Sequence, residues 1–245
     1  MSKKGYTMME MLTVVSIIAI LAAILFPALN MAKKRGAQTR CFSNLGQLAT
    51  SFSSYLEDHQ KYPGGGPAGR FGAGIGPDKV KSEWVYFKYD TTNRVHPQKL
   101  TCDVTQGALF PYVKSPGAYM CPSDQWRVKT KSNGSYAMNA YLDWYYHYDG
   151  AKSSTGVRKA DVKVPAKCPL LIDEGAGCLT RSTGEKWGGM FDGWFDPDVD
   201  QMIMLHSRGC AVAFCDGHAE IVLEKDFDTL HYKPEGDCYG TWHHH

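Results

Sequence analysis

A single carboxylate, Glu10, stands at the start of an apolar run from Met11 to Met31 that carries no formal charge. As a helix this run is about 30 Å long, which is the thickness of the hydrocarbon core of a bilayer. A carboxylate beside such a segment is expensive to bury and therefore marks function by default. It attracts a cation strongly where water is scarce. We predict a membrane-spanning helix over residues 8–31 and a functional role for Glu10.

Three further groups that could do chemistry lie near the other end of the chain. His206, Asp216 and His218 converge if His206 begins the first strand of a hairpin, and such a group suits metal binding or acid–base chemistry. The alternative is structural, with Asp216 serving the turn and His206 hydrogen-bonding across the hairpin base. The sequence contains no G-x-S-x-G or H-E-x-x-H motif. We assign no catalytic residue and expect no enzyme activity.

Four aspartates cluster in one late segment and could hold Ca²⁺, which takes six to eight oxygen ligands. The spacing is not that of an EF-hand, and the alternative is a solvated Asp-Pro loop. Calcium is thus the one cofactor that the sequence suggests. The candidate ligands are Asp192, Asp196, Asp198 and Asp200.

The elements that position these groups begin with a helix that continues past the membrane. Apolar residues recur at steps of four and three residues along one helical face, at Cys41, Leu45, Leu48, Phe52 and Tyr55. Pro27 lacks an N–H and should bend the helix, and the segment 63–67 ends it. An apolar half and an amphipathic half therefore form one helix over residues 6–60, and residues 61–245 form a globular head.

The head contains strand signals, of which the clearest is a hairpin. Residues 210–215 and 218–223 flank Asp216-Gly217, a dipeptide typical of a type I′ turn. The run 170–173 is fit for a buried strand.

Composition limits the remaining possibilities. The sequence contains 27 basic and 25 acidic residues without an aromatic-basic platform, so we expect no nucleic-acid partner. Its 8 cysteines are an even number, and in an exported protein they predict at least two disulfides, with the pairing open. Because no C-x-x-C pair occurs, a zinc ribbon or a thioredoxin site is not expected.

The N-terminus closely resembles the leader of type IV pilins and type II secretion pseudopilins. The resemblance rests on Lys3-Lys4-Gly5-Tyr6, Glu10 at the fifth position after Gly5, and Pro27. It implies that a prepilin peptidase removes residues 1–5 and that the new N-terminal Tyr6 is methylated. It also implies that Glu10 and Pro27 serve in filament assembly. Tyr6 departs from the family, which usually has phenylalanine there.

A second resemblance concerns a large pilin-like family of environmental bacteria with an H-X9-DG motif. His206 followed after nine residues by Asp216-Gly217 is similar to that motif. The segments 40–48, 121–124 and 135–136 resemble the same family. The resemblance implies a pilin-like α+β fold, in which a long N-terminal helix packs on a C-terminal antiparallel β-sheet head with long loops.

Together these features predict a structural subunit of a type IV pilus-like filament. It would wait in the inner membrane, meet an inner-membrane assembly platform and polymerise into a helical homo-oligomer at the cell surface. One alternative is the major pseudopilin of a type II secretion system, in a periplasmic pseudopilus. Another is a membrane-tethered binding or hydrolytic domain that uses the leader only for sorting. An ordinary secretory signal peptide or a plain anchor explains the apolar run but not Gly5-Tyr6 with Glu10.

Overall fold

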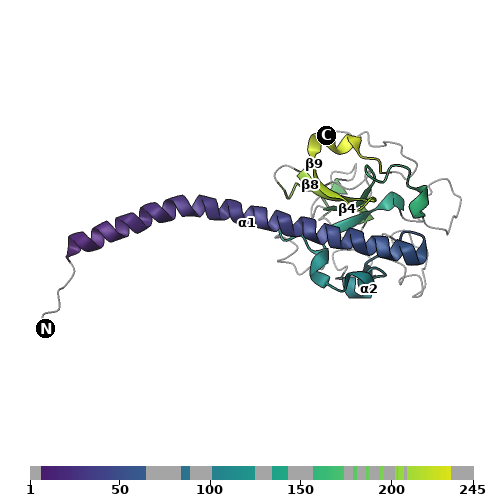
Figure 1. The fold of residues 1–245 in the computed structure, drawn as a ribbon, viewed down its shortest axis with the longest axis horizontal. Coiled ribbons are helices and arrows are strands. Elements are labelled where there is room, and N and C mark those ends of the chain that lie inside the picture. Colours follow the sequence, from purple (N-terminus) through teal and green to yellow (C-terminus); the bar gives the residue numbers. More distant parts are fainter. Residues whose placement is uncertain are drawn as a thin grey trace.

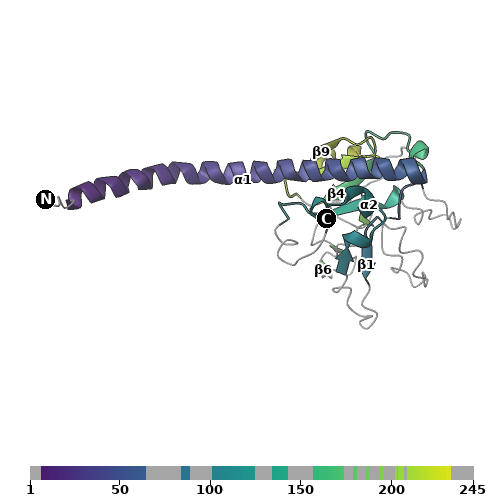
Figure 2. The ribbon, with the colours of Figure 1, turned by 60° about the horizontal axis from the view of Figure 1, so that its bottom comes forward.

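The N-terminal helix α1 runs without a break from Met8 to His59 in the computed structural model of the protein. Its second half crosses the head, whereas its first half extends away from it (Figures 1 and 2). This is the α+β arrangement with a long N-terminal helix that the sequence predicts. The structure describes residues 7–64, 84–88, 101–124, 134–142, 157–173, 179–180, 186–187, 194–195, 202, 204–206 and 209–232. Gly5, Tyr6 and the four candidate calcium ligands Asp192, Asp196, Asp198 and Asp200 lie outside these ranges.

Both ends of α1 have a local cause. At the start, Thr7 and Glu10 form a capping box that satisfies N–H groups of the first turn. At the end, Gln60 takes a left-handed conformation with φ of 63° and donates its N–H to the carbonyl of Leu56. Pro27 lies inside the helix, and α1 curves gently instead of breaking (Figure 1).

The head is organised around a five-stranded sheet with the order β7-β3-β4-β8-β9. Four of these strands pair antiparallel, as predicted, whereas β7 adds to β3 in parallel. The strands are β3 (Tyr136–Asn139), β4 (Pro169–Asp173), β7 (Trp194–Phe195), β8 (Gly209–Phe214) and β9 (Ala219–Leu223).

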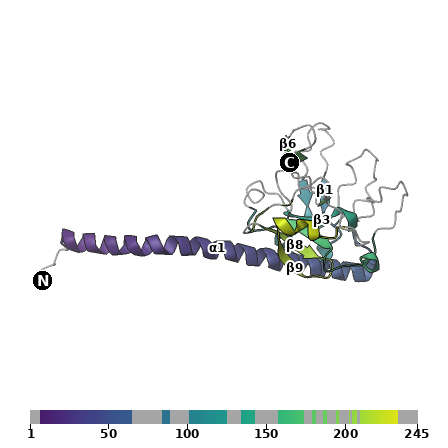
Figure 3. The same ribbon diagram turned by 90° about the horizontal axis from the view of Figure 1, so that it is seen from above.

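The two faces of this sheet have different covers because successive side chains in a strand point to opposite sides. One face packs on the second half of α1, which buries the predicted stripe, including Leu45 and Phe52, against residues such as Met138 and Ala211. The other face packs on a second cluster that includes Val212. Figure 3 shows β8 and β9 lying along the second half of α1.

Smaller elements complete the described part of the head. Two strand pairs lie outside the main sheet, and the remaining elements are short helices. The pairs are β1 (Tyr86–Lys88) with β2 (Thr101–Asp103) and β5 (Leu179–Thr180) with β6 (Lys186–Trp187). The helices are α2 (Phe110–Val113) and the 3₁₀ turns η3 (Val104–Gln106), η4 (Pro116–Tyr119), η5 (Ala140–Leu142), η7 (Lys159–Asp161) and η8 (Glu224–Thr229).

The hairpin between β8 and β9 is present, but its turn differs from the predicted type I′. A type I′ turn needs positive φ at two central residues. Here Gly217 has a φ of 96°, whereas among the described non-glycine residues only Gln60 and Lys114 have positive φ. The Gly217 N–H donates to the Phe214 carbonyl, and the Phe214 N–H donates to the carbonyl of His218. This is the pattern of a three-residue loop with a left-handed glycine.

We predict that Gly217→Val destabilises the protein more than Asp216→Asn. Valine at a left-handed position is strained and should cost about 1–2 kcal/mol of unfolding free energy. Asparagine can still accept the 3.1 Å hydrogen bond that Asp216 Oδ1 accepts from the His218 N–H, and it loses only a surface ion pair worth about 0–1 kcal/mol. Thermal denaturation of the two full-length variants in detergent measures the difference. A more damaging Asp216→Asn change would show that Asp216 does more than form the turn.

Candidate functional site

The first half of α1 presents apolar side chains to its surroundings on every face. From Met8 to Met31 its large apolar residues are between 45% and 91% exposed. In the described part of the chain, α1 is the one helix that is long and apolar enough to cross a membrane. A helix that is apolar all round is stable only in lipid or among other apolar helices. This half of α1 is therefore a surface for lipid or for other subunits.

Glu10 stands at the tip of this surface and also helps to start the helix. Its Oε2 accepts hydrogen bonds of 2.8 Å from both the N–H and the hydroxyl of Thr7, and its own N–H donates to Thr7 Oγ1. A capping box of this kind is readable from Thr7-x-x-Glu10 in the sequence, but our sequence analysis overlooked it. Glu10 thus has a local structural role in addition to its predicted role in assembly.

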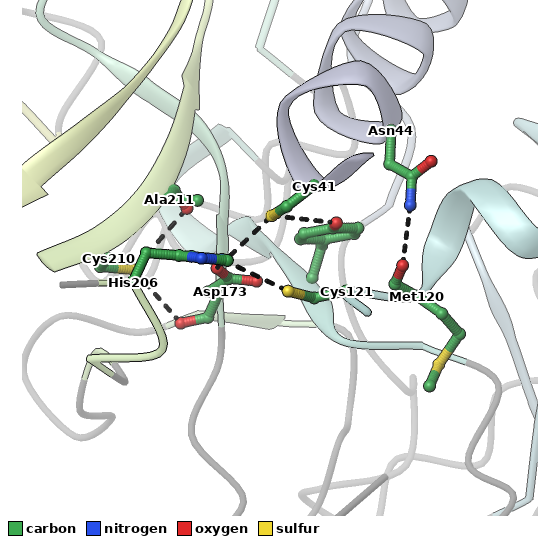
Figure 4. A network of polar contacts seen from close by, with 9 residues as sticks. Cys41, Asn44, Met120, Cys121, Asp173, His206, Cys210 and Ala211 are labelled. Carbon is green, nitrogen blue, oxygen red and sulfur yellow. Dashed lines mark hydrogen bonds and ion pairs between the residues drawn. The ribbon is translucent and has the colours of Figure 1, made fainter. Parts of the chain in front are cut away.

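A second candidate site lies where α1 enters the head. Two sulfur atoms, one nitrogen and one carboxylate oxygen lie within 4.8 Å of one another there. Figure 4 shows their side chains pointing toward a common centre below α1. All four are buried, with exposed fractions between 0% and 3%. The members of this junction cluster are Cys41, Cys121, Asp173 and His206.

Four separate segments place these side chains. Cys41 is the first buried residue of α1, and Cys121 follows η4 in a turn closed by the Asp124 N–H and the Cys121 carbonyl. Asp173 is the last residue of β4, where Tyr136 pairs with it. His206 precedes β8 and exchanges two backbone hydrogen bonds with Gly209.

One polar contact fixes the helix beside this cluster. Asn44, one turn after Cys41, donates from its Nδ2 to the carbonyl oxygen of Met120 at 2.8 Å. Met120 is the neighbour of Cys121, so this bond holds the loop against α1 (Figure 4).

The protonation of the junction cluster is set by burial and by close contacts. Burial raises the pKa of Asp173 to about 7, although a hydrogen bond from His206 opposes this shift. Burial also disfavours the His206 imidazolium, but its hydrogen bonds with Asp173 and Cys121 outweigh that effect and raise its pKa to about 9. A hydrogen bond from Cys41 lowers the pKa of Cys121 to about 5 and correspondingly raises that of Cys41. The cluster therefore holds compensating charges.

The structure separates the residues that the sequence analysis grouped around the hairpin. His206 lies before the start of β8 in the junction cluster, whereas Asp216 and His218 meet after its end, with 2.6 Å between Oδ1 and Nδ1. The alternative in which His206 converges with Asp216 and His218 does not hold, because the full length of β8 lies between them. The structural alternative holds for the turn, where Asp216 Oδ1 accepts a hydrogen bond from the His218 N–H.

The predicted disulfides are not formed by any cysteine whose side chain the structure describes. These five cysteines are all free thiols, namely Cys41, Cys121, Cys168, Cys210 and Cys215. Two pairs of these thiols instead lie within hydrogen-bonding reach of each other, Cys41 with Cys121 and Cys168 with Cys215. An even cysteine count could not reveal this.

The fold and the N-terminal half of α1 define a pilin-like α+β protein, and comparisons with known proteins agree. Residues 1–26 match the family described as the prokaryotic N-terminal methylation motif. Over 59 residues the chain is 41% identical to the type IV wide pilus major component PilA4 of Thermus thermophilus. The matched region covers 24% of this chain and 45% of that pilus component, so less than half of this relative is spanned. No solved structure matches the chain.

We predict that five cysteines remain reduced in the exported protein and differ in their accessibility to solvent. They are Cys41, Cys121, Cys168, Cys210 and Cys215. Cys215 is half-buried, whereas Cys41, Cys121 and Cys168 are fully buried, so Cys215 should be alkylated first in the folded protein. After denaturation with a chelator but without reductant, all of them should react. Peptide mapping by mass spectrometry reads both experiments. A cross-linked pair joining Cys41 to Cys121, or Cys168 to Cys215, would contradict the prediction.

Proposed function

We propose that this protein is a structural subunit of a type IV pilus-like filament. In this proposal a prepilin peptidase cuts after Gly5, and Tyr6 becomes the methylated N-terminus. The apolar half of α1 then holds the subunit in the inner membrane until an assembly platform transfers it to the filament. The match of residues 1–26 to the N-terminal methylation motif supports the processing step, and the similarity to a pilus component supports the class.

The observation that carries the proposal is the unpaired apolar half of α1. The head packs only on the later part of the helix, whose buried residues begin at Cys41. No described residue of the head covers the apolar side chains from Met8 to Met31. These side chains are buried in lipid before assembly. After assembly they are buried against the apolar halves of α1 from neighbouring subunits. Parallel stacking of such helices is a heterologous contact, which generates an open helical polymer.

The finer assignment concerns the machine that assembles the filament. We propose division of the chain into leader 1–5, helix 6–60 and head 61–245, and export of the polymer to the cell surface. A major pseudopilin of type II secretion would share this division of the chain, but its polymer would remain in the periplasm. Electron microscopy and immunoblotting of sheared surface material test this choice. Filaments that contain the subunit support the pilus, and their absence from intact cells favours the pseudopilus.

We predict that the mature protein begins at Tyr6 and that Gly5→Val leaves an uncut precursor. The cleavage site must accept a residue without a side chain, and valine is branched at Cβ. Intact-mass analysis of the membrane fraction should give one N-terminus at Tyr6 for the parent and one at Met1, Ser2 or another upstream residue for the variant. Gly36→Val is a matched control, because a Cβ at Gly36 meets nothing within 4 Å. A parent N-terminus inside the apolar run would contradict the prediction.

We predict that loss of the Glu10 charge reduces filament assembly while insertion and cleavage continue. In a polymer of parallel helices, Glu10 of one subunit can pair with the Tyr6 amine of the next where water is scarce. An unpaired carboxylate among apolar helices is costly, which favours the register that pairs it. Glu10→Leu should therefore lower the ratio of sheared to membrane-held subunit by about tenfold or more.

Glu10→Gln separates the charge from the capping box. Glutamine serves at this position of a capping box, so the start of α1 is retained while the charge is lost. Assembly should fail in both variants if charge pairing sets the register. If Glu10→Gln assembles normally and Glu10→Leu does not, the helix cap is the important contribution and the pairing proposal is overturned.

A further inference from the structure

The junction cluster brings together four side chains whose atoms are all good ligands for one kind of metal ion. Thiolate sulfur and imidazole nitrogen favour zinc over the hard cations calcium and magnesium. The four residues come from four parts of the chain, so their meeting is a property of the fold and not of a short motif. We propose that the protein binds one Zn²⁺ ion through Cys41, Cys121, Asp173 and His206.

Three of the six distances between the ligand atoms are those of a tetrahedral site, and all six are within 4.8 Å. Zinc lies about 2.0–2.3 Å from nitrogen, oxygen and sulfur ligands, so ligand atoms at the corners of a tetrahedron are about 3.3–3.8 Å apart. In the structure, His206 Nε2 lies 3.3 Å from Asp173 Oδ2 and 3.4 Å from Cys121 Sγ. Cys41 Sγ lies 3.8 Å from the same Asp173 oxygen. The cluster therefore needs little rearrangement to accept the ion.

Because the cluster is buried, its negative groups need positive charge close by, which a bound metal ion supplies. Asp173 is 0% exposed, so its carboxylate has no access to solvent. A buried carboxylate beside two sulfur atoms is costly unless a cation is close. Zn²⁺ would bind the deprotonated ligands, and the protons that the two thiols, the carboxyl and the imidazole still hold would pass to solvent. The site then holds two thiolates, one carboxylate and one neutral imidazole around a divalent ion.

Contacts around the ligands would orient them. The Tyr136 hydroxyl donates to Cys41 Sγ at 3.3 Å, and Tyr136 is the cross-strand partner of Asp173. Hydrogen bonds of this kind to metal ligands commonly contribute about 10–100-fold to metal affinity. Because four protein ligands leave no open position, the site is of the structural type. Its consequence is to attach α1, through Cys41, to three segments of the head.

Metal analysis and cobalt substitution of the full-length protein in detergent test this inference. Protein purified with reductant and without added metal should contain about one zinc per chain. After removal of zinc with a chelator, added Co²⁺ should give the visible bands of a tetrahedral site and a thiolate-to-cobalt charge-transfer band. The thiolate band separates this site from cobalt on surface histidines, including the terminal His243, His244 and His245.

Matched variants locate the site. Cys121→Ser and His206→Asn should abolish stoichiometric zinc, whereas Cys215→Ser and His218→Asn should retain it. Tyr136→Phe should weaken zinc binding by about tenfold or more. The parent protein decides the question even if a ligand variant fails to fold. Reduced parent protein without stoichiometric zinc and without a thiolate-to-cobalt band would overturn the inference, as would a disulfide between Cys41 and Cys121 in the exported protein.

Discussion

The constraint on which the rest of this structure depends is the insolubility of the first half of α1. Its apolar side chains face outward around the whole circumference from Met8 to Met31, and water cannot solvate such a surface without a large cost in free energy. The helix must therefore remain in lipid or among other helices. The head can contact only what remains, which is why its core begins at Cys41 and lies along the later turns of α1.

The second half of α1 supplies part of the hydrophobic core of the head. On one face of the sheet, Tyr136, Met138 and Leu171 belong to the same buried cluster as the apolar stripe of α1. The side chains of β4 alternate between the two faces of the sheet. Leu171 and Asp173 face the helix, whereas Ile172 between them faces the second hydrophobic cluster. The alternation that buries the sheet thus also carries Asp173 to the helix, where it meets Cys41.

The sequence could predict the features that depend on local pattern. The apolar run follows from composition, the stripe from Cys41 to Tyr55 follows from the helical period, and the hairpin follows from its Asp216-Gly217 turn signal. The structure contains all three. The turn type was wrong because one positive φ, at Gly217, suffices when the loop has three residues. The junction cluster was missed because its consecutive members lie between 33 and 80 positions apart in the sequence. A search for C-x-x-C spacing excludes zinc ribbons but not a site assembled by tertiary contacts.

The point at which α1 enters the head also determines how the subunit responds to mechanical tension. In a filament of the proposed kind, a pull along the axis would pass through the packed apolar halves of α1 and would reach each head first at Cys41, the first buried residue of the helix. The contacts there would be loaded in shear along the helix axis, and the Asn44 hydrogen bond to Met120 lies within the next turn. The head should therefore resist extension as one unit and yield first at this junction.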